Sequence, residues 1–151
     1  ASQPAISPLR RHVLLTELVL TWGRTIAQSL MVPGRDEPVA IPVVPGDAAF
    51  LARDLATLID DFETEGQSFS GLGGLVPEDH AAYWQLTVAF LRIATEQWPE
   101  ILDQEHRVDP AARRNALLKA ETGRLTSRPP QTPIIAAGST GTIPATADLL
   151  A

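Results

Sequence analysis

Hydrophobic residues recur every three or four positions over much of the chain, which is the spacing of one buried face of an α-helix. The first such pattern follows Ser7-Pro8, a pair typical of a helix start because serine can cap the first turn and proline fits its first position. The stripe consists of Leu15, Leu18, Trp22, Ile26 and Leu30, and it is widened by Leu14 and Val19. We therefore expect a helix that starts at Pro8 and stops before Pro33.

A second helix is expected after a proline-rich connector. Residues 33–46 contain four prolines and two glycines, so they form an extended linker in which residues 39–44 are at best a short edge strand. Asp47 is the expected cap of the helix and Gly66 its C-terminal stop. The expected core positions are Leu51, Leu55, Leu58, Ile59 and Phe62.

Two more helices follow the same periodicity. The third is expected to start at Pro77 and to be kinked or divided at Pro99, because proline removes a hydrogen bond inside a helix. Its core side consists of Tyr83, Leu86, Phe90, Ile93 and Ala94. The fourth starts at the cap-and-proline pair Asp109-Pro110 and is broken within residues 127–132.

The pattern changes near the end of the chain. Residues 133–137 (PIIAA) have the composition of a short buried strand, and a glycine turn then leads into a helix starting near Thr142 to Pro144. One strand and one short helix cannot complete a sheet. We therefore expect a mainly α fragment: a helical subdomain over residues 1–128 with about four main helices, followed over residues 129–151 by a strand, a turn and a truncated helix from an incomplete α/β domain.

The turn after the expected strand has the outline of a phosphate cradle. Its residues are Gly138, Ser139, Thr140, Gly141 and Thr142. A Walker-type loop also requires a lysine, and a dinucleotide fingerprint requires a third glycine; both are missing. Backbone amides at a helix start can still hold an anion weakly, but a plain strand–helix connection is the favoured interpretation. The expected strand also ends without a carboxylate that could organise Mg²⁺.

The charge of the chain constrains its partners. The net charge is −6, and the chain has no cysteine and a single lysine, Lys119. Such an acidic chain should bind DNA poorly unless its basic residues gather locally. They do so on the fourth helix, at Arg113, Arg114, Lys119, Arg124 and Arg128, which could contact a nucleic-acid backbone or an acidic partner. The favoured alternative is an ordinary solvated face with internal salt bridges.

No residue is assigned a catalytic or metal-binding role. The acids Asp60, Asp61, Glu63 and Glu65 follow one another too closely on a helix to converge on a metal, and they predict a solvated helix end beside a cationic neighbour. The three histidines show no metal-binding spacing. The sequence also lacks a membrane-spanning run and a signal peptide, so a soluble cytoplasmic protein is expected.

Several stretches in combination resemble the AddB family of bacterial double-strand break repair proteins, the nuclease-bearing subunit of the AddAB helicase–nuclease. They are ISPLRRHVLLTELVLTW, DDFETEGQSFSGLGGLVPEDHAAYWQLTVAFLRIATEQWPEIL, DPAARRNALLKAE and PIIAAGSTGTIPATADLL. The order and combination of these segments carry the resemblance, since none is a universal chemical motif. It extends from about Ile6 to Ala151.

The resemblance implies an internal part of the N-terminal, helicase-like half of such a subunit. In related helicases a helical subdomain is inserted into a RecA-like domain, and the chain returns through the strand that carries the magnesium-binding acids. The family's nuclease lies beyond Ala151, so none of its residues is carried over. An AddA-type subunit and DNA are the implied partners, and Mg²⁺ and ATP are implied only for the intact complex.

Three functions are therefore considered. The first is a non-catalytic scaffold and DNA-path segment of a helicase–nuclease that processes double-strand breaks for recombinational repair. The alternatives are a small nucleotide- or phosphate-binding α/β protein that uses residues 138–142, and a free-standing helical protein-interaction module. An unpaired terminal strand could also pair two fragments into a dimer.

Overall fold

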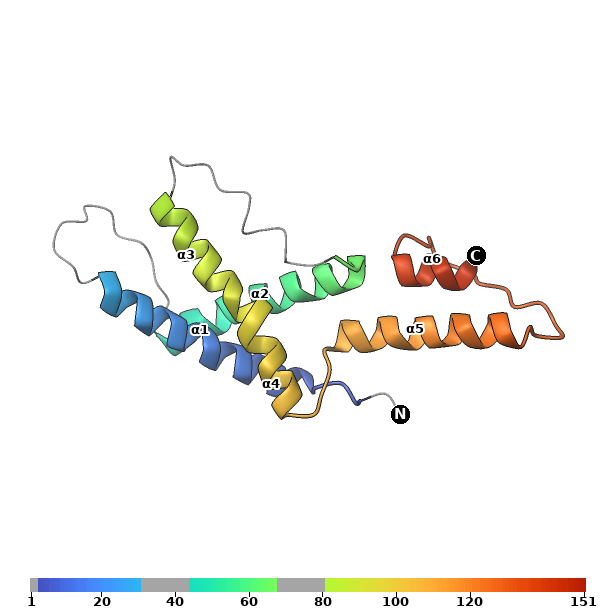
Figure 1. The fold of residues 1–151 in the computed structure, drawn as a ribbon, viewed down its shortest axis with the longest axis horizontal. Helices are drawn as coiled ribbons and strands as arrows, with labels where there is room; N and C mark the ends of the chain where they lie inside the picture. The colour runs from blue at the N-terminus through green and yellow to red at the C-terminus, as the bar shows by residue number, and fades with distance from the viewer. Residues whose placement is uncertain (1–2, 31–43, 68–80) are drawn as a thin grey trace.

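The computed structural model describes residues 3–30, 44–67 and 81–151, and this part of the chain is mainly helical (Figure 1). Helix α1 (Pro8–Leu30) and helix α2 (Pro45–Glu65) lie side by side. Arg11 near the start of α1 contacts Asp60 near the end of α2, so the two helices run antiparallel. Most of the connector expected over residues 33–46 lies outside the described residues, and its last two residues, Pro45 and Gly46, belong to α2. The loop over residues 71–74 and the helix start at Pro77 also lie outside the described residues.

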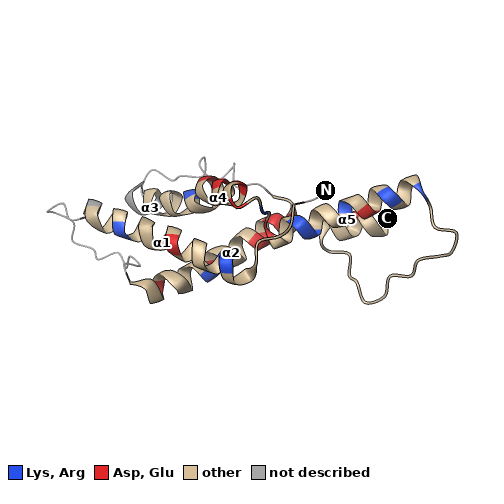
Figure 2. Ribbon diagram, turned by 90° about the horizontal axis from the view of Figure 1, so that it is seen from below, with Lys and Arg blue, Asp and Glu red and all other residues tan. Residues whose placement is uncertain are grey.

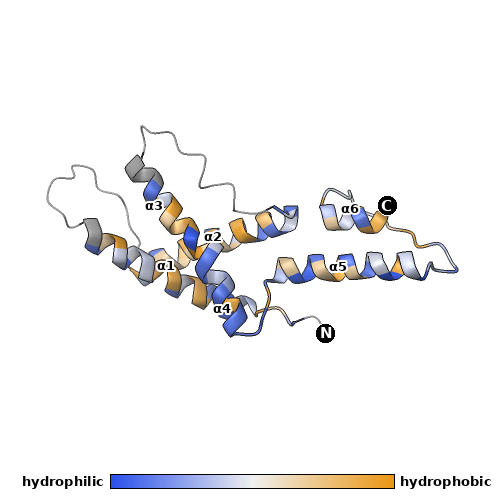
Figure 3. Cartoon of the chain, in the orientation of Figure 1, coloured by the Kyte–Doolittle hydropathy of each residue, from blue (hydrophilic) through white to orange (hydrophobic). Residues whose placement is uncertain are grey.

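The hydrophobic core lies where α1, α2 and the segment around Trp98 meet. On α1, Leu15 and Val19 are fully buried. Facing them on α2, Ala48 and Ala52 are also fully buried, and these small side chains allow the two backbones to approach closely. The complete buried cluster comprises Ile6, Leu14, Leu15, Val19, Ala48, Ala52, Leu55, Ile59, Ile93, Ala94 and Trp98. Figure 3 shows hydrophobic positions gathered where these helices cross.

The third predicted helix is divided as expected, although the interruption lies just before Pro99. Helix α3 (Ala81–Arg92) passes into a π-helical segment, η3 (Ile93–Gln97), which is followed by α4 (Trp98–Gln104) with proline in its first turn. The backbone N–H of Trp98 donates to the carbonyl of Ile93, five residues earlier. This wider turn directs Ile93, Ala94 and Trp98 together into the core, where all three are buried.

Helix α5 (Pro110–Ser127) projects away from this core, and α6 (Pro144–Leu150) packs back along it (Figure 1). We call residues 110–151 the arm. Ala111 on α5 and Ala145 on α6 are the only buried hydrophobic residues of the arm, whereas Leu117 is half exposed. The arm joins the core through the beginning of α5 and its contacts with the end of α2.

The expected strand over residues 133–137 does not form. These residues are irregular and exposed; the exposed fractions of Ile134 and Ile135 are 65% and 85%. Within the described ranges, the single β-type contact joins Ala5 to Val108. The prediction was wrong here because an extended segment becomes a strand only when a neighbour accepts its backbone hydrogen bonds. The helix expected after this segment does form, beginning at Pro144.

The predicted helix ends are mostly correct, but neither Asp47 nor Asp109 caps its helix with its side chain. The hydroxyl of Ser7 accepts a hydrogen bond from the backbone N–H of Arg10 at 3.3 Å. Gly66 ends α2 in the left-handed conformation, with φ 63°. However, α2 begins at Pro45, and Val44 occupies its cap position, so Asp47 lies in the first turn. Asp47 therefore complements the helix dipole instead of capping the helix.

The close approach of α1 and α2 makes Ala52 sensitive to size. We expect Ala52→Leu to lower the free energy of unfolding by about 1–3 kcal/mol, because the added carbons have no space between the helices. The matched change Ala116→Leu, at an exposed position of α5, should have little effect. Urea unfolding followed by circular dichroism measures both. Equal effects of the two changes would contradict the packing described for Ala52.

Candidate functional site at the junction of core and arm

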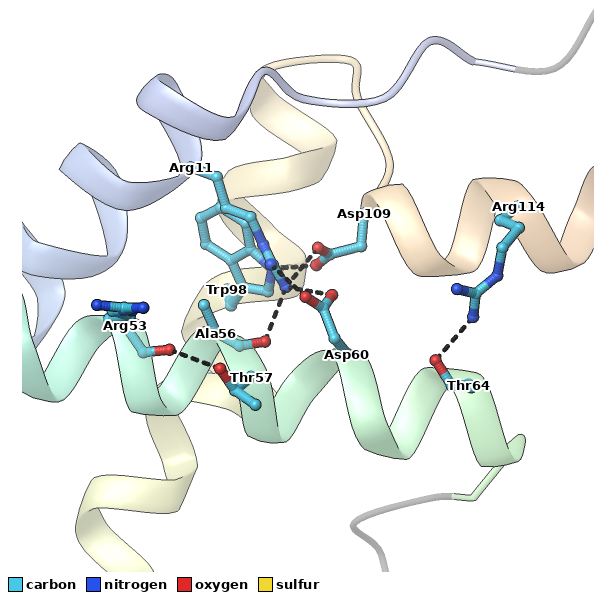
Figure 4. A network of polar contacts seen from close by, with 9 residues as sticks. All are labelled: Arg11, Arg53, Ala56, Thr57, Asp60, Thr64, Trp98, Asp109 and Arg114. Atoms are coloured by element: carbon cyan, nitrogen blue, oxygen red, sulfur yellow. Dashed lines mark hydrogen bonds and ion pairs between the residues drawn. The ribbon is translucent and has the colours of Figure 1, made fainter. Parts of the chain in front are cut away.

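Arg11 occupies the centre of a polar network at the point where the arm leaves the core (Figure 4). Its Nη1 donates to Oδ2 of Asp60 at 3.0 Å, and its Nη2 lies 3.0 Å from Oδ1 of the same carboxylate. Nη2 also lies 2.7 Å from Oδ1 of Asp109 and donates to the carbonyl of Ala56 at 3.3 Å. Arg11 is only 7% exposed, so this side chain ties α1 to α2 and to the start of α5.

Asp109 has a different role from the one its sequence predicts. Its backbone occupies the cap position of α5, but its side chain makes no capping hydrogen bond. Instead, the carboxylate accepts a hydrogen bond from the indole N–H of Trp98 and pairs with Arg11. Asp109 is 3% exposed. The residue that starts α5 therefore also fixes the helix to α4 and α1.

The network carries more negative than positive charge. One guanidinium, that of Arg11, faces the two carboxylates of Asp60 and Asp109. Burial raises the pKa of Asp109, although the hydrogen bond from Trp98 and the charge of Arg11 oppose the shift. Burial also raises the pKa of Glu63 on α2, and the charges of Asp109 and Asp60 add to it. The cationic neighbour expected beside the acidic end of α2 is thus confirmed as Arg11.

A pocket of about 670 Å³ lies beside the network, between the end of α2, η3, α4 and the start of α5. Trp98, Phe62 and Leu102 contribute apolar surface, and Asp109 lines it as well. Glu63 and Asp103 bring carboxylates to the same pocket. It is within the size range of small-ligand sites in proteins.

Four of the five basic residues predicted on the fourth helix lie on α5, and Arg128 directly follows its last residue, but the five do not form one uniform face. Arg124 pairs with Glu121 at 2.6 Å, so the expectation of internal salt bridges is confirmed for this residue. Nη2 of Arg114 donates to the hydroxyl of Thr64 on α2 at 2.7 Å. Lys119 and Arg128 are exposed and form no ion pair with a residue in the described ranges.

Arg113 faces a second pocket, between α5 and α6. This pocket has a volume of about 400 Å³ and is also lined by Leu117 and Leu149. Arg113 and Arg124 are separated by about three helical turns and share one side of α5, whereas Lys119 lies roughly on the opposite side. The guanidinium of Arg113 forms no ion pair within the described part of the chain.

Charge is strongly segregated between the arm and the rest of the chain. Residues 110–151 include five basic and two acidic residues, and residues 1–109 include seven basic and sixteen acidic residues. Figure 2 shows basic positions along α5 and acidic positions on α4 and toward the end of α2. Although the whole sequence has a negative net charge, the arm therefore has a positive net charge.

The glycine turn predicted as a phosphate cradle is exposed and internally bonded. Gly138 and Gly141 have φ values of 77° and 63°, which explains the need for glycine at both positions. The backbone N–H of Gly141 donates to the hydroxyl of Ser139 at 3.3 Å, and the hydroxyls of Thr140 and Thr142 lie 3.2 Å apart. Anion binding at this turn stays a prediction.

Sequence reasoning missed the network that joins Arg11, Asp60 and Asp109. Its only local signals were the Asp109-Pro110 pair and a tryptophan directly before Pro99, and both have simpler explanations in the sequence.

No protein-family model, curated protein or solved structure matches the chain. Among the helices that the structure describes, none has the length and apolar character needed to span a bilayer.

Removing Arg11 should destabilise the fold strongly. We expect Arg11→Met to lower the free energy of unfolding by about 3–5 kcal/mol, because two carboxylates would lose their shared cation. Its neighbour Arg10 provides a matched control, since its pair with Glu105 is exposed to solvent and should contribute little. Chemical denaturation of Arg11→Met and Arg10→Met measures the difference. A loss at Arg11 no larger than at Arg10 would contradict the network's role.

The pH dependence of stability should differ between two carboxylates. Because the pKa of Asp109 is raised in the folded chain, its favourable contribution is present at low pH and is lost as the pH rises through that pKa. The stability of the wild type relative to Asp109→Asn should therefore decrease between pH 4 and pH 7. The hydrogen bond from Arg10 lowers the pKa of Glu105, so the difference relative to Glu105→Gln should increase over the same interval. Unfolding curves across this pH series measure both slopes, and slopes of the same sign would contradict the assignment.

Proposed function

We propose that this chain is a non-catalytic scaffold and DNA-path segment of a helicase–nuclease subunit that processes DNA double-strand breaks. The observation that carries the proposal is the basic arm on an otherwise acidic chain. The resemblance of the sequence to the AddB family supplies the cellular context. In that context an AddA-type subunit is the partner, and ATP hydrolysis and nuclease chemistry take place elsewhere in the complex.

The distribution of charge supports a directed contact with DNA. Lys119 and Arg128 are exposed cations without an ion pair in the described part of the chain, so no internal bond has to break before they contact phosphate. The acidic remainder repels the nucleic-acid backbone. Attraction by these cations and repulsion by the acidic remainder would together hold a DNA strand along α5 and away from the helical core.

The irregular segment before α6 supports the scaffold part of the proposal. Residues 133–137 form no backbone hydrogen bond within the described ranges, and Ile134 and Ile135 are largely exposed. In the proposal, this segment becomes a strand when it joins a RecA-like α/β layer supplied by the rest of the subunit. Burial of the two isoleucines would then favour the docked state.

A second candidate function is a helical protein-interaction module. The pocket between α5 and α6 favours it, because Leu117 and Leu149 provide apolar surface beside the guanidinium groups of Arg113 and Arg114. Such a site suits an acidic, amphipathic helix of a partner. Replacement of Leu117 by Asn, which adds no charge, would weaken binding of a protein partner without reducing the charge-dependent slope of DNA binding.

The DNA contact can be tested with two double variants of equal charge change. We expect Lys119→Gln/Arg128→Gln to weaken binding to a single-stranded oligonucleotide and to reduce the magnitude of the slope of log K against log salt by about 1.4, at about 0.7 per phosphate contact. The control Arg24→Gln/Arg53→Gln removes two exposed arginines from α1 and α2 and should leave the slope nearly unchanged. Fluorescence anisotropy over a salt series measures both.

Two results would contradict the proposal. The first is an equal change of slope in the arm variant and in the control, which would assign binding to net charge and not to α5. The second is sustained ATP hydrolysis by the purified chain, which would be incompatible with a non-catalytic segment.

A further inference from the structure

The pocket beside the Arg11 network combines an apolar interior with acidic groups. Its apolar lining consists of Ile59, Phe62, Ala94, Trp98, Leu102 and Val108. These residues come from α2, η3, α4 and the segment before α5, so the pocket exists only because those elements meet. A volume of about 670 Å³ accommodates a short alkyl chain together with a polar head group.

The carboxylates around this pocket are incompletely neutralised. Asp109 shares Arg11 with Asp60, which leaves that group of three with one excess negative charge. Glu63 and Asp103 also line the pocket, and neither side chain forms an ion pair or hydrogen bond with a residue in the described ranges. Among the described residues, Arg107 is the one cation in the lining, and its charge also acts on Glu105.

The excess negative charge affects the pKa of Glu63. Its pKa is raised first by burial and then by the charges of Asp109 and Asp60. A cation placed among these groups would relieve their repulsion, whereas an anion would increase it. Trp98 and Phe62 are aromatic residues of the lining, and aromatic rings attract cations at their faces.

We propose that this pocket binds an ammonium or guanidinium group carried on an apolar stem. The stem packs against Trp98 and Leu102, and the cationic head lies between the carboxylates of Glu63 and Asp103. A free alkylamine and a lysine or arginine side chain of a partner protein share this chemistry. The site is separate from Lys119 and Arg128 and does not depend on the proposed contact with DNA.

The proposal can be tested by NMR on the whole chain, using the assigned indole N–H signal of Trp98 as the reporter. We expect n-pentylammonium to shift this signal in a saturable way, with a Kd of about 1–10 mM for so small a ligand. The uncharged analogue n-pentanol should bind at least tenfold more weakly. Nα-acetyl-lysine N-methylamide distinguishes the source: tighter binding than the free amine assigns the site to a protein side chain, and weaker binding assigns it to a small amine.

Two matched variants test whether the carboxylate of Glu63 binds the cationic head group. Glu63→Gln should weaken n-pentylammonium binding about fivefold, the effect of one partly screened ion pair. Glu65→Gln removes an exposed carboxylate two residues further along α2 that does not line the pocket, and it should leave the Kd unchanged. Both glutamates lie at the exposed end of the helix, so neither change removes core packing.

The pH dependence gives an independent readout. Binding to the wild type should weaken as the pH falls through the raised pKa of Glu63, because the protonated carboxyl no longer attracts the cation. Glu63→Gln should lose that part of the dependence. Equal affinity for n-pentanol and n-pentylammonium, the same Kd in both glutamine variants, or absence of a saturable shift at Trp98 would overturn the proposal.

Discussion

The guanidinium of Arg11 lies between carboxylates from two different parts of the chain, and the geometry of the arm depends on it. Asp109 is buried and occupies the cap position directly before α5, so its charge must be compensated inside the structure. Arg11 from α1 supplies the compensation, and the indole of Trp98 supplies a hydrogen bond from α4. The direction in which α5 leaves the core is consequently set by electrostatics as much as by hydrophobic packing, since few apolar side chains of the arm are buried.

Local signals in the sequence were sufficient for most helix boundaries. Ser7-Pro8, Gly66 and Asp109-Pro110 act within one helical turn, and each marks the boundary that the sequence suggested. Pro99 also interrupts its helix as predicted, because the missing N–H is a property of the residue itself. The form of the interruption, a π segment, depended on which side chains could be directed into the core.

Features that depend on residues far away in the sequence were harder to predict from the sequence. Residues 133–137 have a strand-like composition, but composition cannot show whether a neighbouring strand is present. Asp109 was recognised as a cap from the proline that follows it, whereas its carboxylate is engaged by Arg11 and Trp98. The pocket is missed for the same reason, because Glu63, Trp98 and Asp103 come together only through the tertiary fold.

The π segment also determines where the chain can change in length. Each residue of an α-helix rotates the backbone by about 100°, and a π turn accommodates one residue more than an α turn. Deleting a single residue between Ile93 and Gln97 would therefore leave a regular α-helix in which the later side chains keep nearly the same direction, because Trp98 would then follow Ile93 by the four residues of an α-helical hydrogen bond. A deletion within the regular turns of α3 would instead rotate Trp98 by about 100° and move its indole away from Asp109. The π segment is thus the place where this helix can lose one residue while Trp98 keeps its hydrogen bond to Asp109 and α5 keeps its position.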